Sequence, residues 1–301
     1  MVNFFAQSYC RNHSIYVFPF EIHEKNGKTR TIITYLKNNV GRSFRRWHED
    51  VLRSLTLLYK SNKHSFAYKK KVSCKSALTD HMKSNCFIKL DIHSFFESIS
   101  YERFLKEGYP LIKKVLEVEE LKALFYDSHL SLGYVTSPII SDIYMNSYDE
   151  KIEEYIKNKP NLHYSRYCDD ILISSEDNDF ADLEALQTFI EKELAKKELS
   201  INKKKEKKEC LNYESHNSFS FLGLNISKKA EGDNKITISK HFILKILDYL
   251  EAYYNNYPNC NYVFKMNILS RIAYIKHNSN ASYDRFLKKH LNRFHKAYEG
   301  I

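Results

Sequence analysis

The stretch YSRYCDDILISS, residues 164–175, places two adjacent acids between two segments that favour β-strands. Tyr164 and Tyr167 precede the acids, and an aliphatic run follows them, which is the pattern of a β-hairpin with a tight turn. Neighbouring carboxylates repel each other, so holding them together at a turn requires a compensating positive charge. Asp169 and Asp170 therefore predict a cation site at the tip of a hairpin, against the simpler alternative of two solvated surface acids.

A third acid lies at the end of another predicted strand. The segment CFIKLDI, residues 86–92, reads as a short buried strand that reaches Asp91. If this strand pairs with the hairpin, Asp91 converges with Asp169 and Asp170. Carboxylate oxygens are hard ligands that prefer Mg²⁺, and two such ions can serve phosphoryl transfer. We therefore expect two Mg²⁺ ions, for which Mn²⁺ could substitute.

The overall composition suits a nucleic-acid partner. The chain has 301 residues and a net charge of +10, with 23 Tyr and 19 Phe. Lys and Arg neutralise phosphates, and aromatic rings stack on bases. A merely soluble basic protein explains the same composition equally well. The 7 Gly and 5 Pro are few, which favours a packed globular chain with few flexible linkers.

The spacing of the cysteines and the length of the apolar segments indicate the cellular location. Six cysteines are scattered along the chain, and no two of them are spaced as C-x-x-C. We therefore expect neither a zinc cluster nor a disulfide framework. The opening segment lacks a basic stretch followed by an apolar core, and no run of 18 apolar residues occurs. These features predict no membrane partner and a reducing cytoplasm.

Helical and strand patterns alternate along the chain, without internal repeats. The segment that begins with Ser137 as the expected N-cap and Pro138 in the first turn has a helical spacing of apolar residues. The other predicted elements are a hairpin at 16–35 that turns at Asn26 and Gly27, helices at 42–60, 102–131, 136–158 and 179–197, a strand–turn–strand at 219–239, and basic helices from 240 onward.

Five ordered segments resemble the motifs of the reverse transcriptase family. The five segments are FIKLDIHSFFESI at 87–99, GYVTSPIISDIYMNSYDEKI at 133–152, YCDD at 167–170, LSINKKKEKK at 199–208 and FLGLNIS at 221–227. In the first segment, the acid is followed four and five residues later by aromatic residues. The second segment begins with a G-x-x-x-S-P turn that enters a helix. The resemblance extends from about residue 16 to the end and is nearest to compact bacterial enzymes of the retron, abortive-infection and defence-associated groups.

The resemblance implies an α+β, right-hand polymerase fold with an antiparallel palm sheet, packed helices and a helical thumb. Fingers with part of the palm would occupy 1–85, the palm 86–235 and the thumb 236–301. The palm would include a helical insertion at 100–132.

The same resemblance assigns the catalytic residues. Asp91, Asp169 and Asp170 would hold the metal ions, assisted by the backbone carbonyl of Ile92. Lys205, three residues after an asparagine, would protonate the leaving pyrophosphate. It lies in a run of lysines, so the register of this assignment stays open, and a solvated lysine run is the ordinary meaning of such a segment.

Other positions match residues that contact the nucleotide. Phe96, five residues after the first acid, would be the steric gate that excludes a ribose 2′-hydroxyl, although Phe95 could exchange roles with it as a core residue. Lys28 and Arg30 would contact the triphosphate. Leu132 stands where family members often place Gln, whose amide reaches the sugar.

The last assignments concern the template, the primer and a turn. Gly133 would shape the turn beneath the nucleotide. Tyr167 and the segment Phe221, Leu222 and Gly223 would contact the primer and template, although strand packing explains this segment nearly as well.

The function implied is RNA-directed DNA polymerase in a bacterial cytoplasm, with dNTPs, an RNA template and a DNA product. A cognate structured noncoding RNA, a role in antiphage defence, and a partner protein or homo-oligomer would suit the nearest groups. The chain lacks the N-A-x-x-H and V-T-G marks of retron enzymes. The alternatives are a template-independent or protein-primed DNA synthetase on the same fold and a non-catalytic RNA-binding protein.

Overall fold

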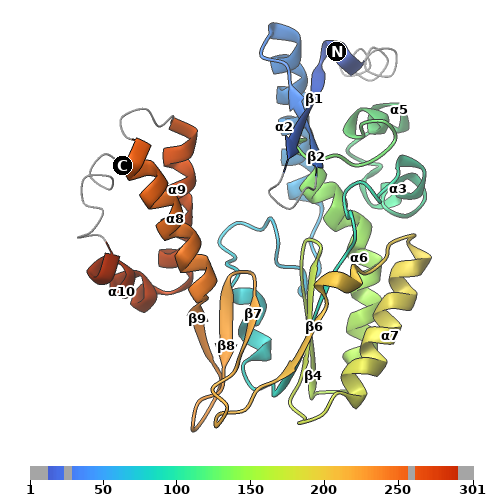
Figure 1. Cartoon of the computed structure of the whole chain (residues 1–301). Helices are drawn as coiled ribbons and strands as arrows, with labels where there is room; N and C mark the ends of the chain where they lie inside the picture. Colours follow the sequence, from blue (N-terminus) through green and yellow to red (C-terminus); the bar gives the residue numbers. More distant parts are fainter. Residues whose placement is uncertain (1–12, 24–28, 257–261, 291–301) are drawn as a thin grey trace.

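A central sheet carries helices on its faces, with a hairpin above it and a group of C-terminal helices beside it (Figure 1). The computed structural model describes residues 13–23, 29–256 and 262–290. The predicted turn at Asn26 and Gly27 and the predicted site residue Lys28 lie outside these residues. No helix within the described ranges is long and apolar enough to span a membrane.

The central sheet has four antiparallel strands in the order β4-β5-β3-β6. Asp91 at the end of β3 lies directly opposite Asp170 at the start of β5, and Tyr167 at the end of β4 also pairs with Asp170. The predicted hairpin and its pairing with the strand of Asp91 are therefore confirmed. The strands are β3 (Cys86–Asp91), β4 (Leu162–Tyr167), β5 (Asp170–Ser175) and β6 (Lys207–Cys210).

Alternating side chains of the sheet enter two separate cores. Ile171 and Ile173 face the larger core, which is shared with the helices α6 and α7, while Leu172 between them faces a second core. In β3, Ile88 likewise faces the larger core and Phe87 faces the second core. Successive side chains of a strand point to opposite faces, so both faces of this sheet are buried. The helices are α6 (Ser137–Ile156) and α7 (Ala181–Lys196).

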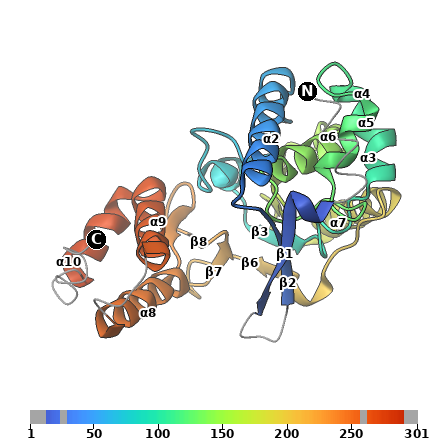
Figure 2. The same ribbon diagram turned by 90° about the horizontal axis from the view of Figure 1, so that it is seen from above.

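The second core joins the sheet to the C-terminal helices. It includes strands of a separate antiparallel sheet in the order β7-β8-β9, so the predicted strand–turn–strand has a third strand. Seen from above, the C-terminal helices form a group beside the rest of the chain (Figure 2). The elements are β7 (Ser218–Phe221), β8 (Leu224–Ser227), β9 (Lys235–Ile238), α8 (Lys240–Asn256), α9 (Tyr262–Asn278) and α10 (Asn280–His290).

The N-terminal part contains the predicted hairpin and helix. The helix α2 begins after Asn38, whose side chain accepts a hydrogen bond of 2.8 Å from the Gly41 amide. Such a cap satisfies a donor that has no partner within the helix. The elements are η1 (His13–Ile15), β1 (Val17–His23), β2 (Thr29–Tyr35) and α2 (Asn39–Leu58).

The prediction of a continuous helical segment at 102–131 was wrong. Gly108 ends the first helix and Pro110 lies in the first turn of the next, while Asp127 and Ser128 have positive φ angles that no helix allows. The segment is divided into α3 (Tyr101–Glu107), α4 (Tyr109–Ile112), α5 (Val118–Leu121) and η3 (Lys122–Leu124), and η2 (Ser76–His81) and η4 (Lys203–Lys205) complete the fold.

The predicted cap of α6 was displaced by one residue. Thr136 occupies the N-cap position, and Ser137 is already helical. The Ser137 hydroxyl donates a hydrogen bond of 2.6 Å to the carbonyl oxygen of Ser131 and therefore closes the preceding turn. The predicted proline, Pro138, does lie in the first turn.

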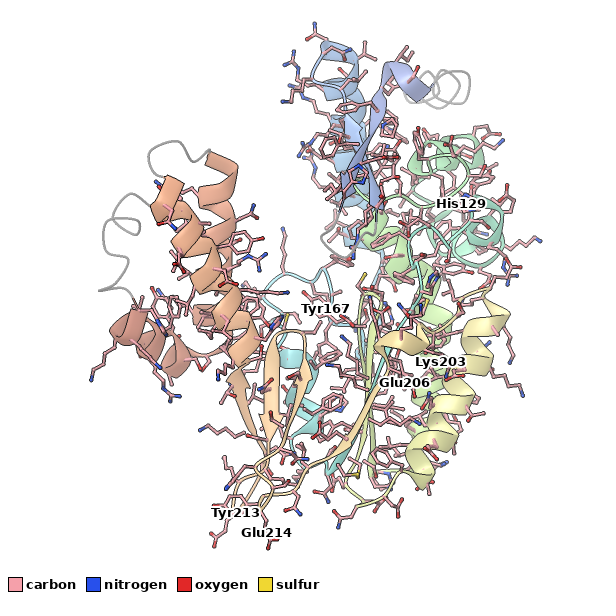
Figure 3. The ribbon with its side chains drawn as sticks, viewed as in Figure 1. His129, Tyr167, Lys203, Glu206, Tyr213 and Glu214 are labelled. Atoms are coloured by element: carbon pink, nitrogen blue, oxygen red, sulfur yellow. A yellow bond between two sulfur atoms is a disulfide. The ribbon has the colours of Figure 1, made fainter. Side chains whose placement is uncertain are left out.

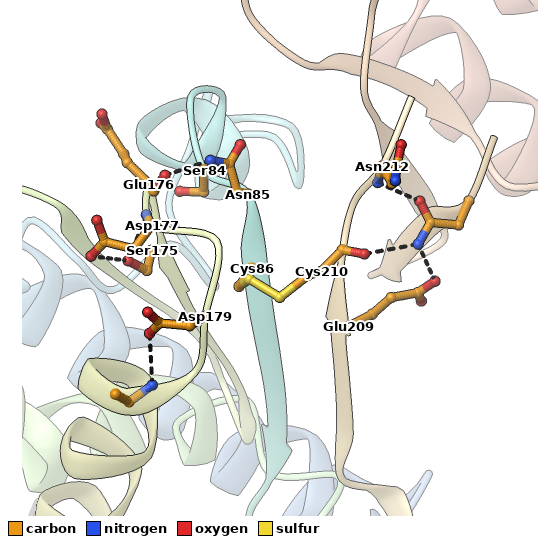
Figure 4. The surroundings of a disulfide bond; sticks show 12 residues. Ser84, Asn85, Cys86, Ser175, Glu176, Asp177, Asp179, Glu209, Cys210 and Asn212 are labelled. Atoms are coloured by element: carbon orange, nitrogen blue, oxygen red, sulfur yellow. Dashed lines mark hydrogen bonds between the residues drawn. A yellow bond between two sulfur atoms is a disulfide. The ribbon is translucent and has the colours of Figure 1, made fainter. Parts of the chain in front are cut away.

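The expectation of no disulfide was also wrong. A disulfide joins Cys86 of β3 to Cys210 of β6 (Figure 4). The two residues lie opposite each other in the antiparallel register, and Cys86 is fully buried. They are 124 residues apart in the chain, so only the pairing of the strands brings them together.

A buried arginine connects the sheet to α6. The side chain of Arg166 in β4 is 1% exposed, and its Nη2 lies 2.6 Å from an oxygen of Asp149 and 2.8 Å from an oxygen of Asp142. Burial alone would raise the pKa of Asp142, but Arg166 and hydrogen bonds from Ser61 and Ser65 outweigh it and lower that pKa. Asp142 is therefore a charged partner of the guanidinium, and Asp149 contacts it from the same helix.

We expect Asp149→Asn to lower the free energy of unfolding by about 3 kcal/mol, because the Arg166 guanidinium would remain buried with one partner lost. The matched control is Asp50→Asn, which removes an ion pair to Arg53 between side chains that are 66% and 73% exposed. That control should change stability by less than about 1 kcal/mol. Urea unfolding measures both variants, and equal effects would contradict a special role for the buried pair.

Candidate active site

A cavity of about 570 Å³ lies at the end of the central sheet where β3 meets the β4–β5 hairpin. Strand β2 and the segment 129–132 form other parts of its wall. Most of the predicted site residues line this cavity. They are Arg30, Asp91, Ile92, Phe96, Leu132, Tyr167, Asp169, Asp170, Lys205 and Leu222.

The register of the sheet brings the three acids together. Asp91 and Asp170 are directly opposed, and the Ile92 amide donates a hydrogen bond of 2.9 Å to the carbonyl oxygen of Asp169. The hairpin turns at Cys168 and Asp169, and Cys168 has a φ of +61°. A positive φ at the first position of a two-residue turn matches the twist of the flanking strands, which makes the turn tight.

Two lysines neutralise two of the acids. Lys205 Nζ lies 2.7 Å from Asp91 Oδ2, and Lys89 Nζ lies 2.6 Å from Asp170 Oδ1. Burial raises the pKa of Asp170, Lys89 opposes this effect, and the charges of Asp169 and Asp91 add to it. The site therefore concentrates negative charge in a poorly solvated place, which a bound cation would stabilise.

Lys89 was missed by the sequence interpretation, which singled out only Lys205. A signal was present, because residues two apart in a strand face the same side and Lys89 precedes Asp91 by two. Within the lysine run whose register was left open, Lys205 is the residue that reaches the first acid and lines the cavity. Lys203 Nζ instead lies 2.5 Å from Glu191 Oε1 of α7 and 3.3 Å from Oε2 of Glu206, three residues further along the chain. Figure 3 labels Lys203 and Glu206.

The chemistry of the acids fits a hard cation. Every donor that Asp91, Asp169, Asp170 and the Ile92 carbonyl can offer is an oxygen, which is the ligand type of Mg²⁺ rather than of zinc. Across residues 13–23, 29–256 and 262–290, no three His, Cys, Asp or Glu side chains are already arranged around a common point as ligands. The two lysine ammonium groups hold two of the carboxylates in the arrangement described.

The two neighbouring phenylalanines have different surroundings. Phe95 is 3% exposed and belongs to the larger core, whereas Phe96 is half-buried and packs against its edge. Both contribute to the cavity wall, with ring centroids 5.6 Å apart. Ser94 before them has a φ of +43°, which turns the chain sharply after β3. Phe96 is therefore the ring with the greater freedom to meet a ligand.

The segment Leu132–Gly133 ties this cavity to the N-terminal hairpin. The carbonyl oxygen of Leu132 accepts a hydrogen bond of 2.8 Å from the Ile33 amide, and the Leu132 side chain is half-buried. Gly133 has a φ of +107°, and a Cβ at this position would lie 2.2 Å from the carbonyl oxygen of Ile33. Only glycine fits this approach. Gly133 supports the wall without lining the cavity, while Arg30 reaches it from β2.

The predicted primer-contacting residues are divided between the cavity and the core. Tyr167 and Leu222 line the cavity, and Figure 3 labels Tyr167 near the upper end of the sheet. Phe221 is 1% exposed and packs in the second core, with its ring centroid 5.6 Å from Lys89 Nζ. Phe221 and Gly223 adjoin the cavity wall but do not form it.

Tyr68 is a cavity residue that the sequence interpretation missed. Its hydroxyl donates a hydrogen bond of 2.9 Å to the sulfur of Cys168, and its side chain is 53% exposed. The segment before it pairs with β4, because Phe66 N lies 2.9 Å from the carbonyl oxygen of Arg166 and Arg166 N lies 2.8 Å from that of His64. The lysine-rich composition of this segment gave no indication of that pairing.

Solved structures with similar folds come from telomerases. Telomerase from Candida albicans matches 98% of this chain and 61% of its own, with a TM-score of 0.54 and 15% identity. Telomerase from Candida tropicalis matches 98% of this chain and 60% of its own, with a TM-score of 0.55 and 13% identity. At these identities the likeness concerns the fold, and it confirms the expected right-hand polymerase architecture.

Sequence comparison points to bacterial relatives. The retron Ec73 reverse transcriptase of Escherichia coli is 26% identical over 124 residues, which are 37% of this chain and 39% of that protein. The retron Ec86 enzyme of the same organism is 25% identical over 162 residues, 52% of this chain and 48% of that protein. The chain thus spans less than half the length of these curated relatives. Residues 22–226 match the family model of reverse transcriptase (RNA-dependent DNA polymerase), so the chain belongs to that family.

Proposed function

We propose that the chain is an RNA-directed DNA polymerase that adds deoxynucleotides to a primer hydroxyl. The observation that carries the proposal is the convergence of Asp91, Asp169 and Asp170 at one wall of the 570 Å³ cavity, with Lys205 at 2.7 Å from the first acid. A cavity of this size accommodates a nucleotide. Membership of the reverse transcriptase family supports the same reaction.

Asp91 and Asp169 would hold two Mg²⁺ ions, with Asp170 and the Ile92 carbonyl in support. When bound, these ions supply activation of the attacking hydroxyl and neutralisation of the leaving oxygen. Lys205 is half exposed on the cavity side, so its ammonium can give a proton to the leaving pyrophosphate. Arg30 can pair with the triphosphate from β2, and Phe96 can limit the space beside the sugar.

A second groove supports an RNA template as partner. It measures about 1100 Å³ and lies between α2, the segment 60–70 and the start of α6. Tyr68 lines both this groove and the catalytic cavity. Lys60, Lys63 and Lys70 are exposed along its edge. An apolar groove with lysines along its edge, which shares Tyr68 with the cavity, suits a single strand that approaches the site.

The remaining assignments extend this proposal. We infer fingers at 1–85, palm at 86–235 and thumb at 236–301. Retron reverse transcriptases of Escherichia coli are among the relatives, which supports a cognate noncoding RNA as template and a role in antiphage defence. A cytoplasmic location suits that role. Sequencing the nucleic acid that co-purifies with the chain tests the template, and DNA made without RNA would favour untemplated synthesis.

We expect Asp169→Asn to abolish DNA synthesis, because it removes a metal-binding carboxylate from the transition state. Melting temperature should not fall, since the change relieves repulsion among three acids. The matched control, Asp182→Asn on α7, alters a carboxylate that is 51% exposed and should leave synthesis unchanged. Primer extension and thermal melting measure these effects, and near-normal synthesis by Asp169→Asn would reject the metal assignment.

Phe96→Val should raise the efficiency of ribonucleotide relative to deoxyribonucleotide incorporation by about tenfold, because it enlarges the pocket beside the sugar. Phe104→Leu is the matched control, since it removes a fully buried ring of the same core away from the cavity wall and should cost about 1 kcal/mol of stability without altering that ratio. Single-nucleotide extension measures both. A preserved sugar preference in an active Phe96→Val enzyme would assign the gate elsewhere.

Replacing Lys60 and Lys70 together by Gln should weaken RNA binding and reduce the slope of log affinity against log salt by about 1.4, at roughly 0.7 per phosphate contact. The control replaces two exposed lysines on other surfaces, Lys192 on α7 and Lys229 after β8, by Gln. Fluorescence anisotropy over a salt series gives both slopes. Equal slopes in the two double variants would remove the groove from the RNA path.

A further inference from the structure

The turn between β7 and β8 is backbone-strained and borders the catalytic cavity. Its two central residues, Leu222 and Gly223, have φ angles of +50° and +79°. Positive angles at both positions define a type I′ turn, in which Asn or Gly is the favoured first residue. Leucine is disfavoured there because its side chain crowds the backbone. Leu222 nevertheless lines the cavity, so contacts outside the turn must hold it.

Those contacts come from the C-terminal helices. The hydroxyl of Tyr274 in α9 donates a hydrogen bond to the carbonyl oxygen of Leu222. Phe242 of α8 lies against Tyr274, with ring centroids 4.6 Å apart. A Cβ on Gly223 would lie 3.2 Å from the Phe242 ring and 3.5 Å from the Tyr274 oxygen, so both side chains close over the turn.

Tyr274 also connects to the acidic hairpin. Cys74, Tyr167 and Tyr274 all pack against the second core, and Tyr167 lies opposite Asp170 in the sheet. Burial, followed by the neighbouring Cys74, raises the pKa of Tyr167 to about 12. Burial likewise raises the pKa of Tyr274, so both hydroxyls keep their protons. The Tyr274 side chain thus contacts the strained turn and packs against the same core as Tyr167, the strand partner of Asp170.

The same stretch of α9 is anchored on the central part of the chain. The Asn278 Oδ1 accepts a hydrogen bond of 3.0 Å from the Lys75 amide, and its Nδ2 donates one of 2.9 Å to the Tyr274 carbonyl. Asn278 is 4% exposed. The position of Tyr274 over the turn is therefore fixed by the docking of α9 beside residues 74 and 75.

We propose that Tyr274 is a positioning residue, which holds the Leu222 turn at the cavity and makes the placement of the primer end depend on the docking of α8–α10. The primer role rests on the proposed polymerase function. Tyr274 acts through Leu222 rather than on the reacting atoms. Loss of its hydroxyl would let the turn relax away from the cavity, which weakens primer binding and leaves the acids in place.

Tyr274→Phe keeps the ring and removes the hydrogen bond to Leu222. We expect the KM for primer–template to rise about three- to tenfold, with kcat at saturating primer nearly unchanged, as for one lost hydrogen bond. The matched control is Tyr283→Phe in α10, whose ring centroid lies 5.5 Å from Lys276 Nζ, and it should change neither quantity. Equal KM values for the two variants would overturn the proposal.

Leu222→Asn tests the mechanism, because Asn suits the first position of the turn without outside support. In that background Tyr274→Phe should raise the KM less than twofold, a coupling that a double-mutant cycle measures. Fully additive effects would overturn the proposal. Thermal melting of each variant is the control for a folding defect.

Amide hydrogen exchange separates this proposal from the polymerase assignment. Exchange at residues 221–224 should be faster in Tyr274→Phe than in Tyr283→Phe or the unaltered chain, because the turn opens more often. Unchanged exchange would overturn the holding role of Tyr274 whatever the activity. An unaltered chain that extends no primer would overturn the polymerase assignment and the primer role with it.

Discussion

The guanidinium of Arg166 is the interaction on which the active-site end of the molecule depends. It is buried between β4 and α6, where Asp149 and Asp142 neutralise it, and its Nη1 donates a hydrogen bond of 3.2 Å to the carbonyl oxygen of Cys168 in the acidic turn. Asp142 in turn accepts from Ser61 and Ser65, which belong to the segment that carries Tyr68. Removing a partner of a buried charge is strongly destabilising. Arg166 therefore fixes the positions of the central sheet, α6 and the β4–β5 hairpin relative to one another.

The acids of the cavity follow a different electrostatic rule. Arg166 and its partners are sealed from water and form a permanent structure, whereas Asp91 and Asp170 face lysines whose side chains are 51% and 20% exposed. The half-exposed Lys205 reaches solvent, and an ion pair of this kind contributes little stability. Lys205 and Lys89 each balance one carboxylate, and the Lys205 side of the site is open to solvent. The buried network around Arg166 therefore stabilises the fold, whereas the separate lysine–carboxylate pairs at the cavity are available for reaction.

Local patterns predicted much of this molecule. The hairpin of Asp169, the strand of Asp91 and the amphipathic helix 179–197 all appeared where expected, because strand alternation and helical periodicity are local properties. Contacts between distant segments could not be read in the same way. The disulfide of Cys86 and the bond from Tyr274 to Leu222 depend on which strands and helices become neighbours. Lys89 is an intermediate case. The sheet face of its side chain was predictable from strand alternation, but its ion-pair partner Asp170 was not.

Backbone strain gathers at the cavity that the three acids line. Nine residues other than glycine have positive φ angles in the described part of the chain, and four of them, Tyr68, Ser94, Cys168 and Leu222, line this one cavity. Such conformations cost roughly 1 kcal/mol or more each and persist only where surrounding contacts hold them. The Tyr68 hydroxyl bonds to Cys168 and the Tyr274 hydroxyl to Leu222, so two strained turns are each held by a tyrosine from another segment. The cavity wall therefore owes its shape to the packing of distant elements, and movement of those elements would change that shape through these turns.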